Sequence, residues 1–167
     1  MPRLGAMLLA TLVGLGACGG NGDPTPPAVG LEQLQERTRA PRDRPLLLVF
    51  WATWCDPCVA EIPDLVTLQT RHQDGLEILS VSLDVFLHPI EQSRALVQAQ
   101  LERTPTPYEH CIYVGTQDAL FAAFELPGGI PYALLFDAGG KLVRHFNGRV
   151  PVEELEQLLA ASSHRSL

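Results

Sequence analysis

Two cysteines separated by two residues stand where an apolar run gives way to an amphipathic one. The apolar run, Leu46–Trp51, is typical of a fully buried strand, and the amphipathic run, Val59–Leu68, is typical of a helix. A C-x-x-C pair at the start of a helix that follows a strand is a redox signature. The helix N–H groups and dipole stabilise a thiolate there, and the thiolate is the attacking species. We therefore predict that Cys55 is the nucleophile and that Cys58, one turn further on, is the resolving thiol.

The composition limits the classes of protein to which the chain can belong. It has 167 residues, 46% of them hydrophobic, which is enough for one domain with its own core. The formal net charge of -7, with no cluster of Lys and Arg, argues against nucleic acid as a partner. Four cysteines are too few for a disulfide scaffold, and a zinc ribbon would need a second C-x-x-C. Haem attachment would need a histidine where Val59 stands, so we expect neither a metal nor a cofactor.

The segment FWATWCDPCVAEIPDL, residues 50–65, resembles the active-site segment of the thioredoxin superfamily. It is most similar to the membrane-anchored, extracytoplasmic reductases of the TlpA/ResA type. The positions that match are Trp54, Cys55, Pro57, Cys58, Glu61 and Pro63. The likeness covers residues 31–167 and implies a thioredoxin-like α/β fold, with a mixed central sheet flanked by helices and an inserted strand-helix unit.

The rest of the pattern predicts the elements of such a fold. A second buried strand over 76–83 would pair in parallel with the first, across an active-site helix over 57–72. Asp137-Ala138-Gly139-Gly140 is a good hairpin turn between two later strands. The other expected strands cover 108–114, 132–136 and 141–146, and the other expected helices cover 31–38, 90–101, 117–124 and 152–160.

Two residues outside the cysteine pair resemble the superfamily's supporting groups. Pro131, in Gly128-Gly129-Ile130-Pro131, corresponds to the proline that faces the cysteines after a cis peptide bond. A trans turn proline is the commoner case, but the context leads us to expect cis. Glu61 follows Cys58 by three residues, so it projects near the cysteine turn. It would either handle the proton of a thiol or be an ordinary solvated charge of the helix.

The segment departs from the superfamily at two positions. Cytoplasmic thioredoxins have a buried aspartate six residues before the nucleophile, where this chain has Val49, so proton handling would fall to Glu61. Asp56 stands between the cysteines, where Gly or Glu is more usual. Its negative charge opposes thiolate formation at both sulfurs.

The remaining conspicuous side chains receive simpler interpretations. We expect Trp54 to be an exposed apolar contact beside the thiol and Trp51 to belong to the core. Cys111 is expected to be buried and inert. His110 beside it is no metal site without further ligands.

The first thirty residues read as targeting and spacing sequence. Residues 1–17 combine Arg3 with a glycine-rich apolar run too short for a comfortable membrane span, which predicts a signal peptide. Leu15-Gly16-Ala17-Cys18 resembles the bacterial lipobox and implies acylation of Cys18. The alternatives are an ordinary signal peptide with an incidental cysteine, or an uncleaved anchor. Residues 18–30, rich in Gly and Pro, would form a flexible linker to a domain over 31–167.

The predicted function is thiol-disulfide exchange in the bacterial cell envelope, on the periplasmic side and lipid-anchored to a membrane. The domain would reduce disulfides in partner proteins, and the resemblance implies a connection with cytochrome c maturation. A membrane electron donor such as a DsbD/CcdA-type thiol carrier would then restore the dithiol.

Several alternatives remain open. The same site run in reverse would be a disulfide-forming oxidase. A module without redox activity, or one that binds copper(I) through its thiolates, is a different class. A peroxiredoxin is disfavoured, because Thr53 and Cys55 do not supply its threonine-and-cysteine motif.

Overall fold

The apolar run at 46–51 forms a central strand of a six-stranded mixed sheet. The computed structural model describes residues 25–163. The strands are β1 (Ala28–Val29), β2 (Leu46–Trp51), β3 (Glu77–Ser82), β4 (Glu109–Tyr113), β5 (Tyr132–Phe136) and β6 (Leu142–Asn147). The helices are α1 (Leu31–Arg39), α2 (Asp56–Arg71), α3 (Ile90–Arg103), α4 (Gln117–Phe124) and α5 (Val152–Ser163), with a 3-10 turn, η1, at Asp84–Phe86. The thioredoxin-like α/β architecture predicted from the sequence is confirmed.

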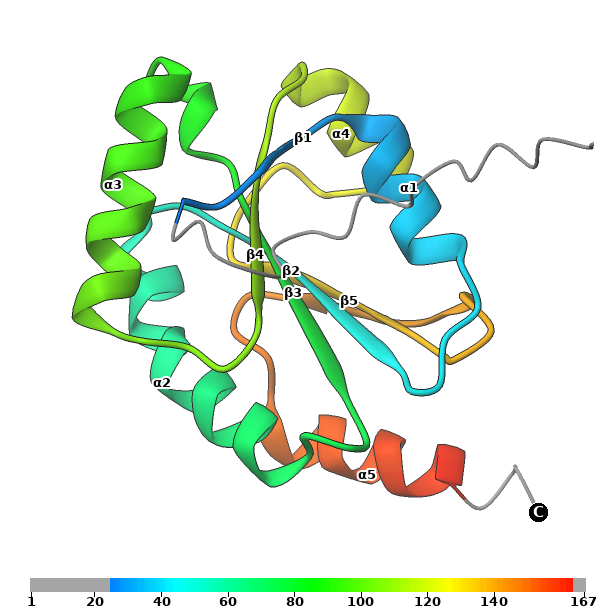
Figure 1. Cartoon of the computed structure of the whole chain (residues 1–167). Helices are drawn as coiled ribbons and strands as arrows, with labels where there is room; N and C mark the ends of the chain where they lie inside the picture. Colours follow the sequence, from blue (N-terminus) through cyan, green and yellow to red (C-terminus); the bar gives the residue numbers. More distant parts are fainter. Residues whose placement is uncertain (1–24, 164–167) are drawn as a thin grey trace, which may run out of the picture.

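The order of strands places the cysteine pair at one edge of the sheet. The order is β1-β4-β3-β2-β5-β6, with β1 to β4 mutually parallel and β5 and β6 antiparallel to their neighbours. The carboxyl ends of β2, β3 and β4 therefore meet at the same edge. The segment that leads from β2 into α2 leaves from this edge (Figure 1).

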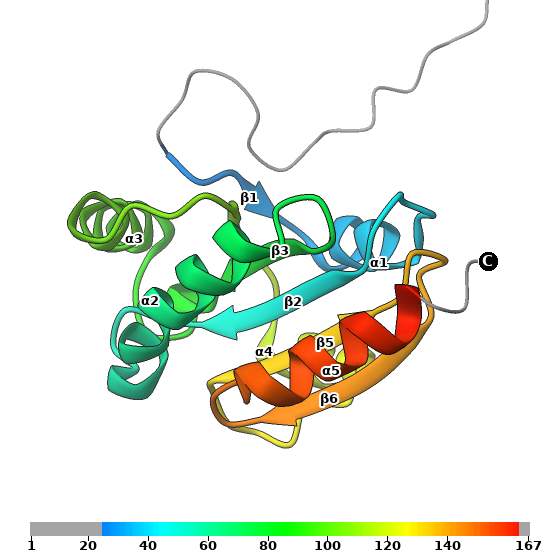
Figure 2. The same ribbon diagram turned by 90° about the horizontal axis from the view of Figure 1, so that it is seen from below.

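Alternation along β2 explains why its whole length is apolar. Leu46, Leu48 and Phe50 pack into a cluster with α1 and α4 on one face of the sheet. Leu47 and Val49 pack into a cluster with α2 and α5 on the other face. Figure 2, a view of the molecule from below, shows α2 and α5 in front of the sheet. A strand that is covered on both faces reads as a continuous hydrophobic run, because neither set of alternate side chains meets water.

A short strand precedes Leu31, the predicted start of the domain. Ala28 and Val29, inside the segment predicted to be a flexible linker, form β1 and pair with Ile112 and Tyr113. The carbonyls of Pro27 and Val29 accept the N–H groups of Ile112 and Val114. The chain around β1 therefore pairs with the edge of the sheet that β4 would otherwise leave open. The predicted signal peptide, residues 1–17, and the predicted lipidation site, Cys18, lie outside the described residues. Within 25–163, no helix is long and apolar enough to cross a membrane.

Candidate active site

The cysteine pair is joined by a disulfide at the first turn of α2. Cys55 is the N-cap residue, with extended backbone angles, and its sulfur accepts the N–H of Cys58 at 3.3 Å. Pro57 occupies a first-turn position where a helix has no partner for an N–H, so its missing donor costs nothing. This geometry puts the sulfur of Cys55 against the helix N–H groups and the positive end of the dipole. The described structure therefore holds the two thiols where the sequence predicted them.

The two sulfurs face different surroundings. Cys55 lies beside the loop before β5, with its sulfur 3.7 Å from the carbonyl oxygen of Ile130. The Ile130–Pro131 peptide bond is cis, as the sequence analysis expected. Cys58 is 2% exposed and lines a cavity between α2 and the sheet. Cys55 is thus the sulfur on the loop side and Cys58 the sulfur on the core side.

The residues around the pair differ sharply in exposure. Trp54 is 42% exposed, whereas Trp51 is 4% exposed and belongs to the core. Asp56 and Pro57 are both exposed at the start of α2. The exposure of Trp54 and the burial of Trp51 are as predicted, whereas the roles of Trp54, Asp56 and Pro57 in exchange remain predictions.

A buried carboxylate, which the sequence analysis missed, anchors the loop before Cys55. Asp84 is fully buried at the start of η1. It accepts the N–H of Thr53 at 3.1 Å, the hydroxyl of Thr53, and the hydroxyl of Ser82 at 2.7 Å. The only signal in the sequence is an aspartate directly after a buried strand, at the edge where the parallel strands end. Because Thr53 lies two residues before Cys55, Asp84 fixes the path of the chain into the cysteine turn.

Glu61 is a second buried carboxylate, on the helix side of the pair. It is 2% exposed, so the alternative of a solvated helix charge is wrong. Its carboxylate accepts the N–H of Val150, which lies between β6 and α5. Burial raises the pKa of Glu61, against the opposing effects of the Val150 N–H and of Arg149, and Asp64 raises it further. A carboxyl group with a raised pKa can accept a proton from a neighbouring thiol near neutral pH.

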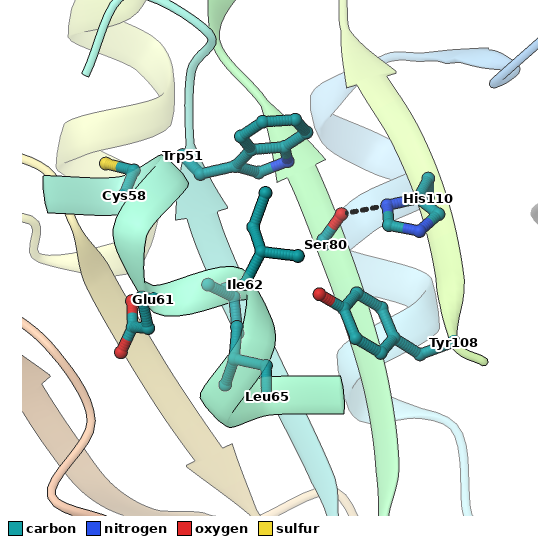
Figure 3. Close-up of a pocket in the computed structure, with 9 residues that line it drawn as sticks. Trp51, Cys58, Glu61, Ile62, Leu65, Ser80, Tyr108 and His110 are labelled. Carbon is teal, nitrogen blue, oxygen red and sulfur yellow. Dashed lines mark hydrogen bonds between the residues drawn. The ribbon is translucent and has the colours of Figure 1, made fainter. Parts of the chain in front are cut away.

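Glu61 and Cys58 line the same cavity, which lies under α2 (Figure 3). Val49, at the position where cytoplasmic thioredoxins have an aspartate, is also in its wall. The lining residues come from α2, from β2 and β3 and from the start of β4: Val49, Trp51, Cys58, Glu61, Ile62, Leu65, Ser80, Tyr108 and His110. The carboxylate that lines this cavity together with Cys58 therefore comes from α2 rather than from β2.

Ser80, Tyr108 and His110 also line the cavity, although no motif in the sequence marks them. His110 pairs with Ser80 across β3 and β4, and its ring nitrogens are hydrogen-bonded to the hydroxyls of Ser80 and Thr106. Burial lowers the pKa of His110 to about 4, so the ring is neutral at neutral pH. Tyr108 and His110 are two residues apart in an extended segment, so both lie on one face of the sheet. This spacing is the only feature of the sequence that could have indicated that they lie together.

Cys111 is fully buried in β4, as expected. Among residues 25–163, no group of three or more His, Cys, Asp or Glu side chains is placed to hold a metal ion.

Comparisons with known proteins agree with this geometry. The redoxin family matches residues 22–161. The thiol-disulfide oxidoreductase ResA of Geobacillus thermodenitrificans (strain NG80-2) is 29% identical over 130 residues, which are 77% of this chain and 69% of that protein. A solved structure of a putative thiol:disulfide interchange protein DsbE from Chlorobium tepidum has 24% identity and a TM-score of 0.59, over 77% of this chain and 83% of the other. StoA from Bacillus subtilis has 20% identity and a TM-score of 0.56, over 70% and 82%. The two solved structures share the fold with this chain.

Proposed function

Because this chain belongs to the redoxin family, as a thiol-disulfide oxidoreductase of the ResA type, we propose that it reduces disulfides in partner proteins outside the cytoplasm. One observation carries the proposal. The Cys55–Cys58 disulfide lies at the N-terminus of α2, and Cys58 lines a cavity together with a buried carboxylate, Glu61. Such a site offers an activated thiol, a resolving thiol and an acceptor for the proton of the second thiol.

The proposed cycle transfers two electrons from the dithiol to the partner. The Cys55 thiolate attacks one sulfur of the partner's disulfide, which forms a mixed disulfide and expels the other partner sulfur as a thiolate. Cys58 then loses its proton to Glu61, and its thiolate attacks the sulfur of Cys55. The Cys55–Cys58 bond forms, the second partner sulfur leaves as a thiolate, and both partner thiolates take protons from water. The partner is reduced, and the protein is oxidised.

The charges around the pair favour the reducing direction. A strong oxidant of this fold owes its potential to a stabilised reduced form. Here Asp56 lies between the two cysteines, and Glu61 shares the cavity of Cys58. Negative charge at either place disfavours a thiolate and so destabilises the reduced form. The dithiol is therefore expected to give up electrons readily.

The place of action is proposed from the N-terminal sequence and the relatives. A signal peptide over 1–17 and acylation at Cys18 would hold the domain on a membrane, facing the periplasm. Since the periplasm is kept oxidising, a membrane thiol carrier of the DsbD/CcdA type would have to supply the electrons. Apocytochrome c, or a factor that matures it, is the substrate class to try first.

The test is reduction of a protein disulfide by the purified dithiol form. Reduced protein should convert the disulfides of insulin to thiols, with two thiols formed per Cys55–Cys58 disulfide. Cys55→Ser should abolish this reaction, and Cys58→Ser should accumulate mixed disulfides with proteins of a periplasmic extract. Cys111→Ala is the matched control, because it removes a cysteine outside the pair and should leave exchange intact. A wild-type protein that reduced nothing but was isolated with bound copper would overturn the proposal in favour of a binding module.

A further inference from the structure

Three exposed apolar side chains follow neighbouring strands at the edge of the sheet that carries the cysteine pair. Trp54 comes after β2, Leu87 after β3 and η1, and Val114 after β4. Their exposed fractions are 42%, 63% and 40%. The other large apolar side chains that are exposed in the described part of the chain, Leu142 and Val143, begin β6 at the opposite edge. The proposed cycle assigns no role to Leu87 or Val114, so their exposure needs an explanation.

The strand ends that carry these side chains lie side by side. Trp51, at the end of β2, is in register with Ser82 of β3, and Ser82 is in register with Ile112 of β4. Neighbouring strands are about 4.8 Å apart, so the ends of β2 and β4 are about 10 Å apart. An extended peptide rises about 3.3 Å per residue, so about three residues span this distance. A partner segment whose cysteine lies at Cys55 is therefore long enough to reach the ends of β3 and β4.

The loops at these strand ends are held to one another. The carboxylate of Asp84 accepts the N–H of Thr53, and the carbonyl of Asp84 accepts the N–H of Leu87 at 3.0 Å. Phe86 packs edge-on against Tyr113, the last residue of β4, with ring centroids 6.1 Å apart. A surface that is preorganised in this way loses little conformational entropy when it binds.

The charge at this edge is negative. The chain passes from β2 into α2, from β3 through η1 into α3, and from β4 into α4 at this edge (Figure 1). The first turns of these helices contain Asp56, Glu91 and Asp118, where an acidic residue also stabilises the helix dipole. All three side chains are exposed, and none forms an ion pair within the described residues. The loops that precede these helices contain no lysine or arginine.

We propose that Trp54, Leu87 and Val114 form a docking surface for an extended segment of the partner protein that carries apolar and basic side chains beside its disulfide. The inference rests on the proposed function, because it names the class of disulfide that Cys55 attacks. Leu87 and Val114 contact the partner at a distance from the reacting sulfurs, so they determine specificity.

Charge selects this occupant over the alternatives. A second copy of the chain would bring the same three carboxylates to the interface, and like charges placed opposite one another disfavour association. An anionic lipid surface would be repelled in the same way. A segment with lysine or arginine is attracted, because the arginine in the neighbouring connection from β6 to α5, Arg149, is already paired with Asp64.

The first test uses two peptides of equal length, each with one cysteine in a mixed disulfide with a chromogenic aryl thiol. Both contain lysines, and the residues about three places from the cysteine on either side are leucine in one peptide and serine in the other. Attack by Cys55 on the peptide sulfur releases the aryl thiol, which is the better leaving group. Stopped flow with the reduced full-length protein gives a rate constant for each peptide. The leucine peptide should react about tenfold faster, as expected from partial burial of its leucines.

Leu87→Ser and Val114→Ser should each reduce this preference to about threefold, and the double variant should abolish it. The ratio of the two rate constants cancels any change in the reactivity of Cys55. Val143→Ser is the matched control, because Val143 is a valine of similar exposure at the opposite edge, and it should keep the wild-type preference. No preference in the wild type, or the same preference in the double variant, would overturn the inference. Insulin reduction by the wild type would then still stand, which separates this failure from a failure of the proposed function.

The second test concerns charge and uses two leucine peptides, one with lysines and one with glutamates. The lysine peptide should react about tenfold faster at low ionic strength. This preference should disappear in about 1 M salt, where the screening length is about 3 Å. The double variant Glu91→Gln, Asp118→Asn should lose most of the preference, whereas Glu102→Gln, at the other end of α3, should keep it. Equal rates for the two peptides at low ionic strength would overturn the choice of a basic partner.

Sedimentation velocity tests the alternative occupant, a second copy of the chain. The wild type and the double variant Leu87→Ser, Val114→Ser should have the same sedimentation coefficient. A wild-type dimer that the double variant dissociates would show that a second copy covers these side chains, and it would overturn the inference.

Discussion

Two buried carboxylates hold the segments before and after the cysteine pair, and their hydrogen-bond partners differ. Asp84, on the loop side, accepts hydrogen bonds from the backbone and hydroxyl of Thr53 and from the hydroxyl of Ser82. Glu61, on the helix side, accepts one hydrogen bond, from the N–H of Val150. Burial disfavours a charged carboxylate, and each donor offsets part of that cost. The number of donors therefore separates a carboxylate held from several directions from one held by a single N–H.

The two carboxylates also differ in the part of the site that each one supports. The loop that carries Trp54 and Cys55 must keep its path, so its support is a carboxylate bound on several sides. In the proposed cycle the thiol of Cys58 loses its proton to Glu61, a carboxylate of the same cavity whose pKa is raised by burial. We therefore propose that Asp84 holds the loop in position and that Glu61 accepts the proton.

The largest effect is expected from Asp84→Ala. The change leaves the Thr53 N–H, the Thr53 hydroxyl and the Ser82 hydroxyl without their acceptor, and each buried unpaired group costs about 1–3 kcal/mol. The free energy of unfolding should fall by about 4 kcal/mol, as measured by urea denaturation. Asp74→Ala, at an exposed turn, is the control and should change stability little. Equal stabilities of the two variants would remove Asp84 as an anchor.

Glu61→Gln tests the other side of the comparison, and its effects on rate and stability should oppose each other. The amide can still accept the Val150 N–H, but it cannot take the proton of Cys58. The rate can be followed by stopped flow, with the reduced protein and a disulfide of two chromogenic aryl thiols. Release of the second aryl thiol reports attack by Cys58, and at pH 7 it should slow by about 100-fold, equivalent to about 2.7 kcal/mol in the barrier.

Stability should move in the other direction. Since burial raises the pKa of Glu61, the folded protein binds this proton more tightly than the unfolded chain does. Ionisation of Glu61 thus destabilises the fold as pH rises above the ordinary value of 4.5. The glutamine variant should therefore be at least as stable as the wild type at pH 7 by urea denaturation. A variant that was both less stable and unchanged in rate would make Glu61 a structural group like Asp84.

His110 extends the comparison to a buried base whose two nitrogens are both hydrogen-bonded. Its pKa is lowered from 6.5 to about 4, so the unfolded chain binds the proton first as pH falls. The stability that depends on neutral His110 is complete above pH 6.5 and is lost toward pH 4. At pH 5 the loss should be about 2 kcal/mol relative to pH 7.

Urea denaturation of His110→Gln at both pH values measures this loss. The free energy of unfolding should change less between pH 7 and pH 5 in the variant than in the wild type, by about 2 kcal/mol. If the difference between pH 7 and pH 5 were the same in both proteins, the pKa of His110 in the folded state would have to be the ordinary value of 6.5.

The smallest effect is expected from Thr53→Val, which keeps the shape of the side chain and removes one of the donors to Asp84. The Thr53 N–H and the Ser82 hydroxyl remain, so the loss should be about 1 kcal/mol in urea denaturation. Thr67→Val is the control, because its hydroxyl bonds to the carbonyl of Pro63 at an exposed place. A loss as large as that of Asp84→Ala would mean that the anchor depends on this single hydroxyl.

Most of the fold could be predicted from the sequence because its signals are local. The run at 46–51, the helix that begins beside Cys55 and the hairpin at 137–140 each carry their own pattern, and the structure has all three. β1 was missed because two residues, Ala28 and Val29, cannot show a periodicity. Their pairing depends on β4, more than 80 residues away.

The polar parts of the site were harder to predict because they depend on contacts between distant segments. Asp84 meets Thr53 across 31 residues, and Ser80 meets His110 across 30. The burial of Glu61 follows from the packing of Val150, 89 residues further on. The cysteines and Pro131 could be predicted because they belong to a motif. No motif indicates the shape of the cavity.

The reduction potential of the Cys55–Cys58 pair tests the central claim most directly. The claim is that negative charge around the pair disfavours the thiolates, so the dithiol is a reductant. The potential would be measured at pH 7 by equilibration of the full chain in thiol buffers. We predict a value near that of thioredoxin, about -270 mV. A value near that of a strong oxidant, about -120 mV, would contradict the account and reverse the proposed direction of exchange.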